Sequence, residues 1–188
     1  KPTGGTFFHN SATVKLDGST TTNVDVNSTL ELYNLTVNKI PASPIVQFVQ
    51  SSDLVVATGT LRMQDGLFLG AMTIESTGPL IHSSNWDGGD GTVKVTGAAR
   101  TINLGENGKF PQLVLLSSGT VVNLVGTAST TLNNVTIGAG TLNANTSEVG
   151  IYTHLYLDGS GASYVGGSNG YKIFQSLSNE AFYSRILT

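Results

Sequence analysis

Apolar and polar residues alternate along most of this chain, in short segments with a period of two. Thr13-Val14-Lys15-Leu16 is one such segment. A period of two places alternate side chains on one face of an extended strand, so each segment predicts a half-buried β-strand. The clearest segments are residues 13–16, 24–26, 30–32, 35–37, 93–95, 102–104, 113–115 and 155–157. Asp-Gly pairs and other glycine-rich breaks separate the segments and predict tight turns.

Four short segments of the sequence recur in the same order about 80 residues later. The pairs are TVKLDG (13–18) with TVKVTG (92–97), LYNLTV (32–37) with FPQLVL (110–115), LVVATGTL (54–61) with VTIGAGTL (135–142), and AMTIESTG (71–78) with HLYLDGSG (154–161). A degenerate tandem duplication is the economical explanation. We therefore expect Val14 and Val93, and likewise Leu35 and Leu113, to occupy equivalent positions around one shared interior.

The predicted fold is all-β, and the duplication favours a β-solenoid made of two degenerate repeats of about 80 residues. Stacked coils tolerate small slips in spacing, because insertions bulge out at the corners while the inward apolar residues stay in line. A β-sandwich, as one jelly roll or as two tandem modules, is the alternative. Equivalent Asn or Thr residues of neighbouring coils are expected to form hydrogen-bonded ladders.

The domain prediction is one continuous unit with three parts. Residues 1–81 form the first repeat, residues 82–163 the second, and residues 164–188 a C-terminal cap or an extra strand or short helix. The last part differs because its apolar residues are spaced closer to the helical period. A cap at this end is expected to cover apolar surface and unpaired strand edges.

Charged residues are scarce, at 11% of the chain, and the formal net charge is −3. Without clustered Lys or Arg the sequence predicts no binding to nucleic acid or to an anionic membrane. No apolar run approaches the roughly 18 residues of a membrane span, so no membrane insertion is expected. The chain starts at Lys1 without a signal-like stretch, which fits a processed or truncated piece of a larger protein. The absence of cysteine excludes disulfides and thiolate metal sites.

NWDGGDG (85–91) is the most suggestive loop. Asp87 and Asp90, with nearby carbonyl groups, offer oxygen ligands for calcium, and glycine suits the bend of such a loop. The loop lacks the spacing of an EF-hand, and a surface turn between repeats is the favoured alternative. Trp86 aligns with Phe7 of the first repeat, so packing in the core or at a corner is favoured over a platform for a sugar.

No arrangement of residues predicts catalysis. Glycoside cleavage needs a pair of carboxyl groups, and no two acids are paired by their spacing. The acids considered were Asp53, Asp65, Glu75, Asp87, Asp90, Glu106, Glu148 and Asp158. His9, His82 and His154 have no spacing that supports a metal site or a triad. The chain is therefore predicted not to be an enzyme, with no catalytic residues and no cofactor other than the weak calcium candidate.

Four segments resemble a repeat of large bacterial and phage surface proteins: GTVKVTG (91–97), TINL (101–104), FPQLVLLSSGTVVNL (110–124) and VTIGAGTLNA (135–144). The resemblance covers most of residues 6–160. It implies a right-handed parallel β-helix, as in adhesins, autotransporter-like passengers and phage tail fibres or spikes. The first repeat departs from the pattern at residues 40–44, where two prolines predict a corner or an excursion.

The expected function is that of a non-enzymatic structural or adhesive module in a fibre, spike or adhesin on a virion or cell surface. Its expected partners are other copies of the chain, as a homo-oligomer with a trimer favoured by the resemblance, and a surface glycan or protein receptor. One alternative is a polysaccharide-degrading tailspike or lyase. A second alternative is a subunit of a surface filament or a capsid decoration protein.

Overall fold

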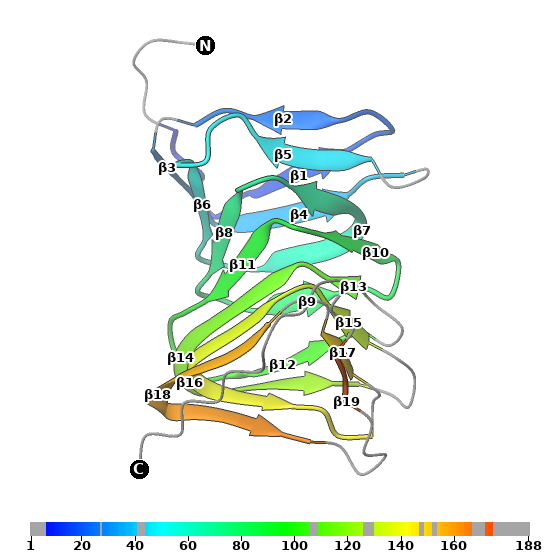
Figure 1. The fold of residues 1–188 in the computed structure, drawn as a ribbon. Coiled ribbons are helices and arrows are strands. Elements are labelled where there is room, and N and C mark those ends of the chain that lie inside the picture. Colours follow the sequence, from blue (N-terminus) through cyan, green and yellow to red (C-terminus); the bar gives the residue numbers. More distant parts are fainter. Residues whose placement is uncertain are drawn as a thin grey trace.

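The computed structural model describes residues 7–26, 28–40, 44–105, 109–125, 130–146, 149–151, 154–166 and 172–174. These residues form parallel strands in stacked coils, a β-solenoid of about 7 turns. Figure 1 shows the coils following one another along the stack, from β1 and β2 at one end to β18 at the other. The described part of the chain holds no helix long and apolar enough to cross a membrane. The predicted β-solenoid is confirmed, and its right-handed sense stays a prediction.

Each coil has three sides, and strands of successive coils pair along each side, except between β9 and β12 on the first side. The first side contains β1 (Thr13–Asp17), β4 (Asn34–Asn38), the start of β7 (Leu61–Leu69), β9 (Leu80–His82), β12 (Thr101–Leu104) and the ends of β14 (Gln112–Leu124), β16 (Val135–Asn143) and β18 (Leu155–Val165). The second side contains β2 (Thr22–Val24), β5 (Ile45–Phe48), the end of β7, β10 (Trp86–Gly89), β13 (Lys109–Phe110), β15 (Thr130–Leu132), β17 (Val149–Ile151) and β19 (Lys172–Phe174). The third side contains β3 (Thr29–Leu32), β6 (Leu54–Ala57), β8 (Thr73–Ser76), β11 (Thr92–Val95) and the starts of β14, β16 and β18.

The repeating unit of the structure is a single coil, which is shorter than the predicted repeat. The inward column of the third side shows this unit, because its members pair in register from coil to coil. They are Val55, Ile74, Val93, Leu113, Val135 and Leu155. Val55 and Val135 are thus four coils apart on the same side. The recurrence of LVVATGTL as VTIGAGTL therefore spans four coils, and the predicted repeat corresponds to four turns of the stack.

The predicted equivalence of Val14 with Val93, and of Leu35 with Leu113, is wrong. Val14 pairs with Leu35 on the first side, whereas Val93 pairs with Leu113 on the third side. TVKLDG thus pairs with the strand of LYNLTV in the next coil, and TVKVTG pairs with the strand of FPQLVL in the next coil. Alternation tells which residues point inward, but it carries no information on which of the three sides they come from. The predicted β-solenoid still holds, because residues from all three sides point into one interior.

The interior is a continuous apolar column that receives side chains from every side. Val37, Phe68, Val95 and Leu124 are fully buried members from different coils. Each such burial contributes about 1.5–3 kcal/mol relative to an exposed side chain. Several inward residues of the first coil, such as Leu30, are only partly buried, and so are Leu157 and Tyr164 of the last coil. The apolar column is therefore less covered at both ends of the described stack.

A ladder of asparagines runs along the outside of the later coils, as predicted. Asn103, Asn123 and Asn143 lie in register on the first side. Asn123 Nδ2 donates to Asn103 Oδ1 at 3.4 Å, and Asn143 Nδ2 donates to Asn123 Oδ1 at 3.2 Å. These bonds connect three successive coils through side chains alone.

Most of the predicted C-terminal cap, residues 164–188, lies outside the described residues. Within it, Tyr164 and Val165 end β18, and residues 172–174 form β19, which pairs with β17. The described part of this segment thus continues the strands of the coil.

Candidate functional site

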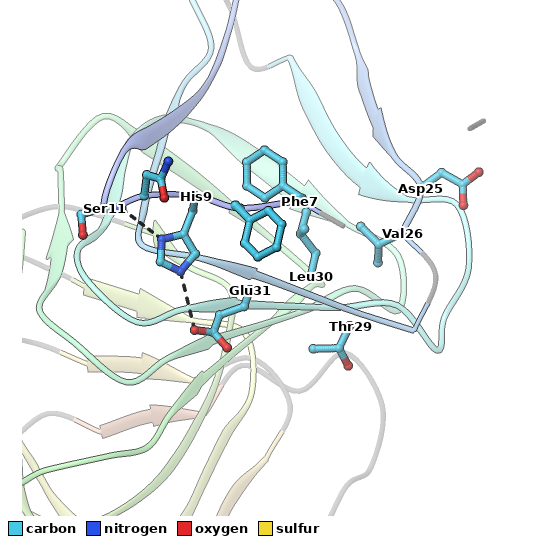
Figure 2. A pocket seen from close by; sticks show the side chains of 10 residues that line it. Phe7, His9, Ser11, Asp25, Val26, Thr29, Leu30 and Glu31 are labelled. Atoms are coloured by element: carbon cyan, nitrogen blue, oxygen red, sulfur yellow. Dashed lines mark hydrogen bonds and ion pairs between the residues drawn. The ribbon is translucent and has the colours of Figure 1, made fainter. Parts of the chain in front are cut away.

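A large cavity of about 740 Å³ lies at the open end of the first coil. Figure 2 shows His9 between Ser11 and Glu31 at its wall. His9 Nδ1 accepts a hydrogen bond from the Ser11 backbone N–H at 3.2 Å, and His9 Nε2 lies 3.7 Å from Glu31 Oε1. His9 also stacks on Tyr33, with ring centroids 6.0 Å apart.

This end cavity lies where inward residues of the first coil are only partly buried, and both apolar and polar residues line it. Phe7 and Phe8 beside it are 54% and 78% exposed, and Leu30 on its wall belongs to the inward residues of the first coil. The pair of His9 and Glu31 is solvent-accessible, so it contributes little energy. The end cavity is therefore an end surface of the stack.

A second cavity, of about 350 Å³, lies on the second side of the solenoid and crosses four successive coils. We call it the side groove. Its lining residues are Leu69, Asp87, Gly88, Gly89, Asp90, Lys109, Phe110, Thr131 and Asn133. Asp87 pairs in register with Lys109, and Lys109 with Thr131, so these three side chains form a row along the stack.

Two adjacent glycines lie in the lining of the side groove. Gly88 and Gly89 have φ values of 89° and 105°, next to a β-bulge between β10 and β7. A Cβ atom added to Gly89 would overlap the Phe68 carbonyl group, and one added to Gly88 would lie 3.0 Å from Lys109 Cβ. Only glycine fits this backbone, because the flanking coils approach it closely on both sides.

Backbone hydrogen bonds fix two polar residues at the rim of the side groove. Asp90 Oδ1 accepts from the Gly70 N–H at 2.7 Å. Asn133 Nδ2 donates to the Gly89 carbonyl at 3.3 Å. Gln112 Nε2 donates to the Asp90 carbonyl at 3.0 Å, which holds the end of the glycine-rich loop. The rim is thereby positioned by the fold before any ligand arrives.

Trp86 lies beneath the side groove, inside the stack. Its side chain is 1% exposed, and its ring meets Phe68 edge-on with centroids 4.6 Å apart. Trp86 Nε1 donates to the Gly88 carbonyl at 3.1 Å and so supports the glycine backbone from within. The ring faces have no contact with solvent in this arrangement, which corresponds to the packing alternative for Trp86.

The structure brings Asp87 and Asp90 to the same cavity. Among the described residues, no group of three or more His, Cys, Asp or Glu side chains is placed to hold a metal ion. Lys109 lines the same cavity, and Asp90 Oδ1 already accepts a backbone hydrogen bond. Calcium favours six to eight oxygen ligands, so calcium binding by Asp87 and Asp90 stays a prediction from the sequence.

His82 fixes the coil behind Lys109. His82 Nδ1 accepts from the Gly105 N–H at 3.0 Å, so the proton resides on Nε2, which donates to the Lys109 carbonyl at 3.0 Å. Burial lowers the pKa of His82 to about 4, and the hydrogen bond with Lys109 opposes this shift in part. His82 is therefore a neutral bridge between neighbouring coils.

The other residues considered from the sequence are not part of the side groove. Asp53 is buried and accepts from the Val26 N–H at 3.3 Å, and Glu75 Oε1 accepts from Thr96 Oγ1 at 2.7 Å. Glu106 and Glu148 lie outside the described residues. Sequence reasoning missed Lys109, Thr131 and Asn133. A search at one-coil spacing would have found two of them, because Asp87, Lys109 and Thr131 follow one another at equal intervals along the chain.

Comparisons with protein-family models, curated proteins and solved structures found no match to this chain. The resemblance to bacterial and phage surface proteins is thus supported only as far as the β-solenoid and its repeats.

Proposed function

We propose that the chain is a non-enzymatic structural and adhesive module of a fibre, spike or adhesin on a virion or cell surface. The observation that carries this proposal is the unbroken stack of parallel coils around one apolar column. At about 4.8 Å per coil, about 7 turns make a segment about 34 Å long. Parallel ladders run along the whole second and third sides and along the first side except between β9 and β12, and they resist bending and local unfolding, which suits a load-bearing surface element.

The location is tested by labelling native particles or cells with antibodies raised against the purified chain. Immunogold electron microscopy is expected to place the label on thin projections at the surface. Labelling confined to the cell interior would overturn the proposal. A regular lattice of label on a capsid would favour the alternative of a decoration protein.

Self-association forms part of the same proposal. Outward apolar side chains such as Tyr156 and Leu116 are 40% and 43% exposed, and parallel sheets offer flat faces for lateral contact. A mass measurement in solution at micromolar concentration is expected to show an oligomer, and a trimer is the form that the resemblance favours. A monomer alone would contradict this part.

A second candidate function, cleavage of polysaccharides, is favoured by the presence of Asp87 and Asp90 on one cavity. Two carboxyl groups across a bound sugar are the minimum equipment for glycoside hydrolysis. Incubation of the chain with a panel of capsular polysaccharides tests this candidate. Release of soluble sugar by the wild type but not by Asp87→Asn would replace the non-enzymatic proposal.

A further inference from the structure

We propose that the side groove binds a neutral or amine-bearing saccharide unit of a surface glycan. This inference deepens the adhesive half of the proposed function by giving it a site and a class of ligand. It starts from the shape of the groove. A cavity of about 350 Å³ lies within the range of small-ligand sites, and its place on the side of the stack is independent of how the ends are covered.

The lining combines apolar and polar groups in the way a sugar ring requires. Leu69 and the Cα atoms of the two glycines supply apolar surface, Phe110 is 1% exposed and belongs to the buried layer behind them, and Asp87 and Lys109 supply charged groups. A pyranose ring has C–H groups on its faces and hydroxyl groups around its edge. Such a ligand can place its faces on the apolar part while its hydroxyl groups reach the polar rim.

The polar rim offers both acceptors and donors. Carboxylates accept hydrogen bonds, an ammonium group donates them, and hydroxyl and amide groups do both. Each sugar hydroxyl can also donate and accept, so one ligand can satisfy Asp87, Lys109 and Thr131 together. A ligand with only one kind of group would match only part of this hydrogen-bonding capacity, at a cost in affinity.

Charge narrows the ligand class further. Two carboxyl groups and one ammonium group give the groove a formal charge of one negative unit, and the whole chain carries −3. Acidic sugars are therefore repelled, whereas neutral sugars are tolerated and amino sugars are attracted. Preorganisation of Asp90 and Asn133 by backbone hydrogen bonds reduces the entropy lost on binding.

The test is titration of the full chain with three sets of oligosaccharides: neutral, amine-bearing and acidic. Isothermal calorimetry or amide chemical shifts provide the readout. We expect millimolar or tighter dissociation constants for the first two sets, and binding at least tenfold weaker for the acidic set. No binding of any neutral or amine-bearing oligosaccharide at about ten times that concentration overturns the inference, as does a preference for the acidic set.

Variants locate the site. Asp87→Asn and Lys109→Ala are each expected to weaken binding of neutral oligosaccharides at least tenfold. The matched controls are Asp17→Asn and Lys15→Ala, an exposed acid and cation 3.1 Å apart on the first side, which should leave binding unchanged. Urea unfolding of each variant checks that the fold is retained. Wild-type affinity in both groove variants overturns the inference even if the chain binds sugar.

This experiment and the labelling experiment can fail separately. Labelling reports where the chain resides, whereas titration reports whether this groove binds sugar. Surface labelling without sugar binding leaves the structural role intact and removes the groove proposal. Sugar binding that needs Asp87 and Lys109, without surface labelling, keeps the groove and removes the proposed location.

Discussion

The coils built from residues 13–95 and those built from residues 101–165 turn the corner between the third and first sides differently. In the earlier coils the strands stop before this corner and side chains bond to its carbonyl groups. The most heavily bonded is Arg100, which follows β11 at the boundary between the two regions and donates to the carbonyls of Ser76, Thr77 and Thr96 at 2.6–3.1 Å. In the later coils β14, β16 and β18 pass through the corner as continuous strands of 13, 9 and 11 residues.

Glycine makes the continuous corners possible. Gly140 of β16 has a φ of 90°, and a Cβ atom at this position would lie 2.7 Å from both the Ser117 and Thr120 carbonyl oxygens. Glycine is also required at the earlier corners, because a Cβ atom added to Gly78 would overlap the Gly59 carbonyl group. Buried polar side chains occur in both regions, since Ser76 Oγ donates to the Gly78 carbonyl and Ser117 Oγ donates to the Gly97 carbonyl. The two regions therefore differ in whether the strand continues through the corner.

The largest expected effect comes from adding a methyl group at a continuous corner. Gly140→Ala combines a left-handed backbone, which costs about 1–3 kcal/mol for a residue with a side chain, with an overlap that costs about 1–3 kcal/mol. We expect the free energy of unfolding, measured with urea, to fall by about 3–5 kcal/mol.

Gly161→Ala is the matched control in β18. No atom lies within 4 Å of its added Cβ atom, and its φ is outside the left-handed region. Its free energy of unfolding should change by no more than about 0.5 kcal/mol. An equal loss in both variants would show that the corner geometry of Gly140 is not the cause.

The fold was predictable from alternation, but the arrangement of strands into sides was not. Val93 and Val95 were expected to face the interior, and both are fully buried. The assignment of Val14 and Val93 to equivalent positions failed because aliphatic residues fill the column on every side. A single coil is also difficult to detect from sequence because its length varies. On the third side, Val93 follows Ile74 at a shorter interval than Val135 follows Leu113.

The sequence predicted only those residues of the candidate site that lie together in one loop, residues 85–91. Asp87 and Asp90 stand out because glycines surround them in the sequence. Lys109 and Thr131 are ordinary residues until the coil register places them beside Asp87. The spacing of the histidines did not predict a role for His82 either. Its neutral state results from burial and from its two hydrogen bonds to the backbone.

The second prediction concerns the junction between the two regions, where His82 of β9 bonds to the backbone at Gly105 and Lys109. The pKa of His82 is lowered from 6.5 to about 4 by burial, so the unfolded chain takes up a proton before the folded chain does. The contribution of the neutral state to stability is complete above pH 6.5, decreases as the pH falls toward 4, and is lost below it. The loss amounts to about 3 kcal/mol.

Urea unfolding of the wild type and of His82→Gln between pH 7.5 and about 4 measures this contribution. Carboxyl groups titrate in both proteins, so the difference between them isolates His82. The stability of the wild type should fall more steeply through this range than that of His82→Gln. Parallel curves for the wild type and His82→Gln would contradict the assignment of a neutral bridge.

The smallest expected effect tests the asparagine ladder, which joins the later coils from outside. Asn123 is its centre: it donates to Asn103 and accepts from both Asn143 and Asn145. These bonds measure 3.2–3.4 Å and lie near solvent, so each is worth at most about 0.5 kcal/mol. Asn123→Ala should therefore lower the free energy of unfolding by about 1 kcal/mol.

Asn103→Ala removes the residue at the end of the ladder and loses only the hydrogen bond from Asn123. Its loss of unfolding free energy should therefore be less than half that of Asn123→Ala. The double variant Asn123→Ala/Asn143→Ala should cost less than the sum of the single variants, because both lose their shared bond. Strict additivity would mean that the ladder is a consequence of the register and not a contributor to it. The corners and the apolar column would then hold the later coils together without help from the side chains outside.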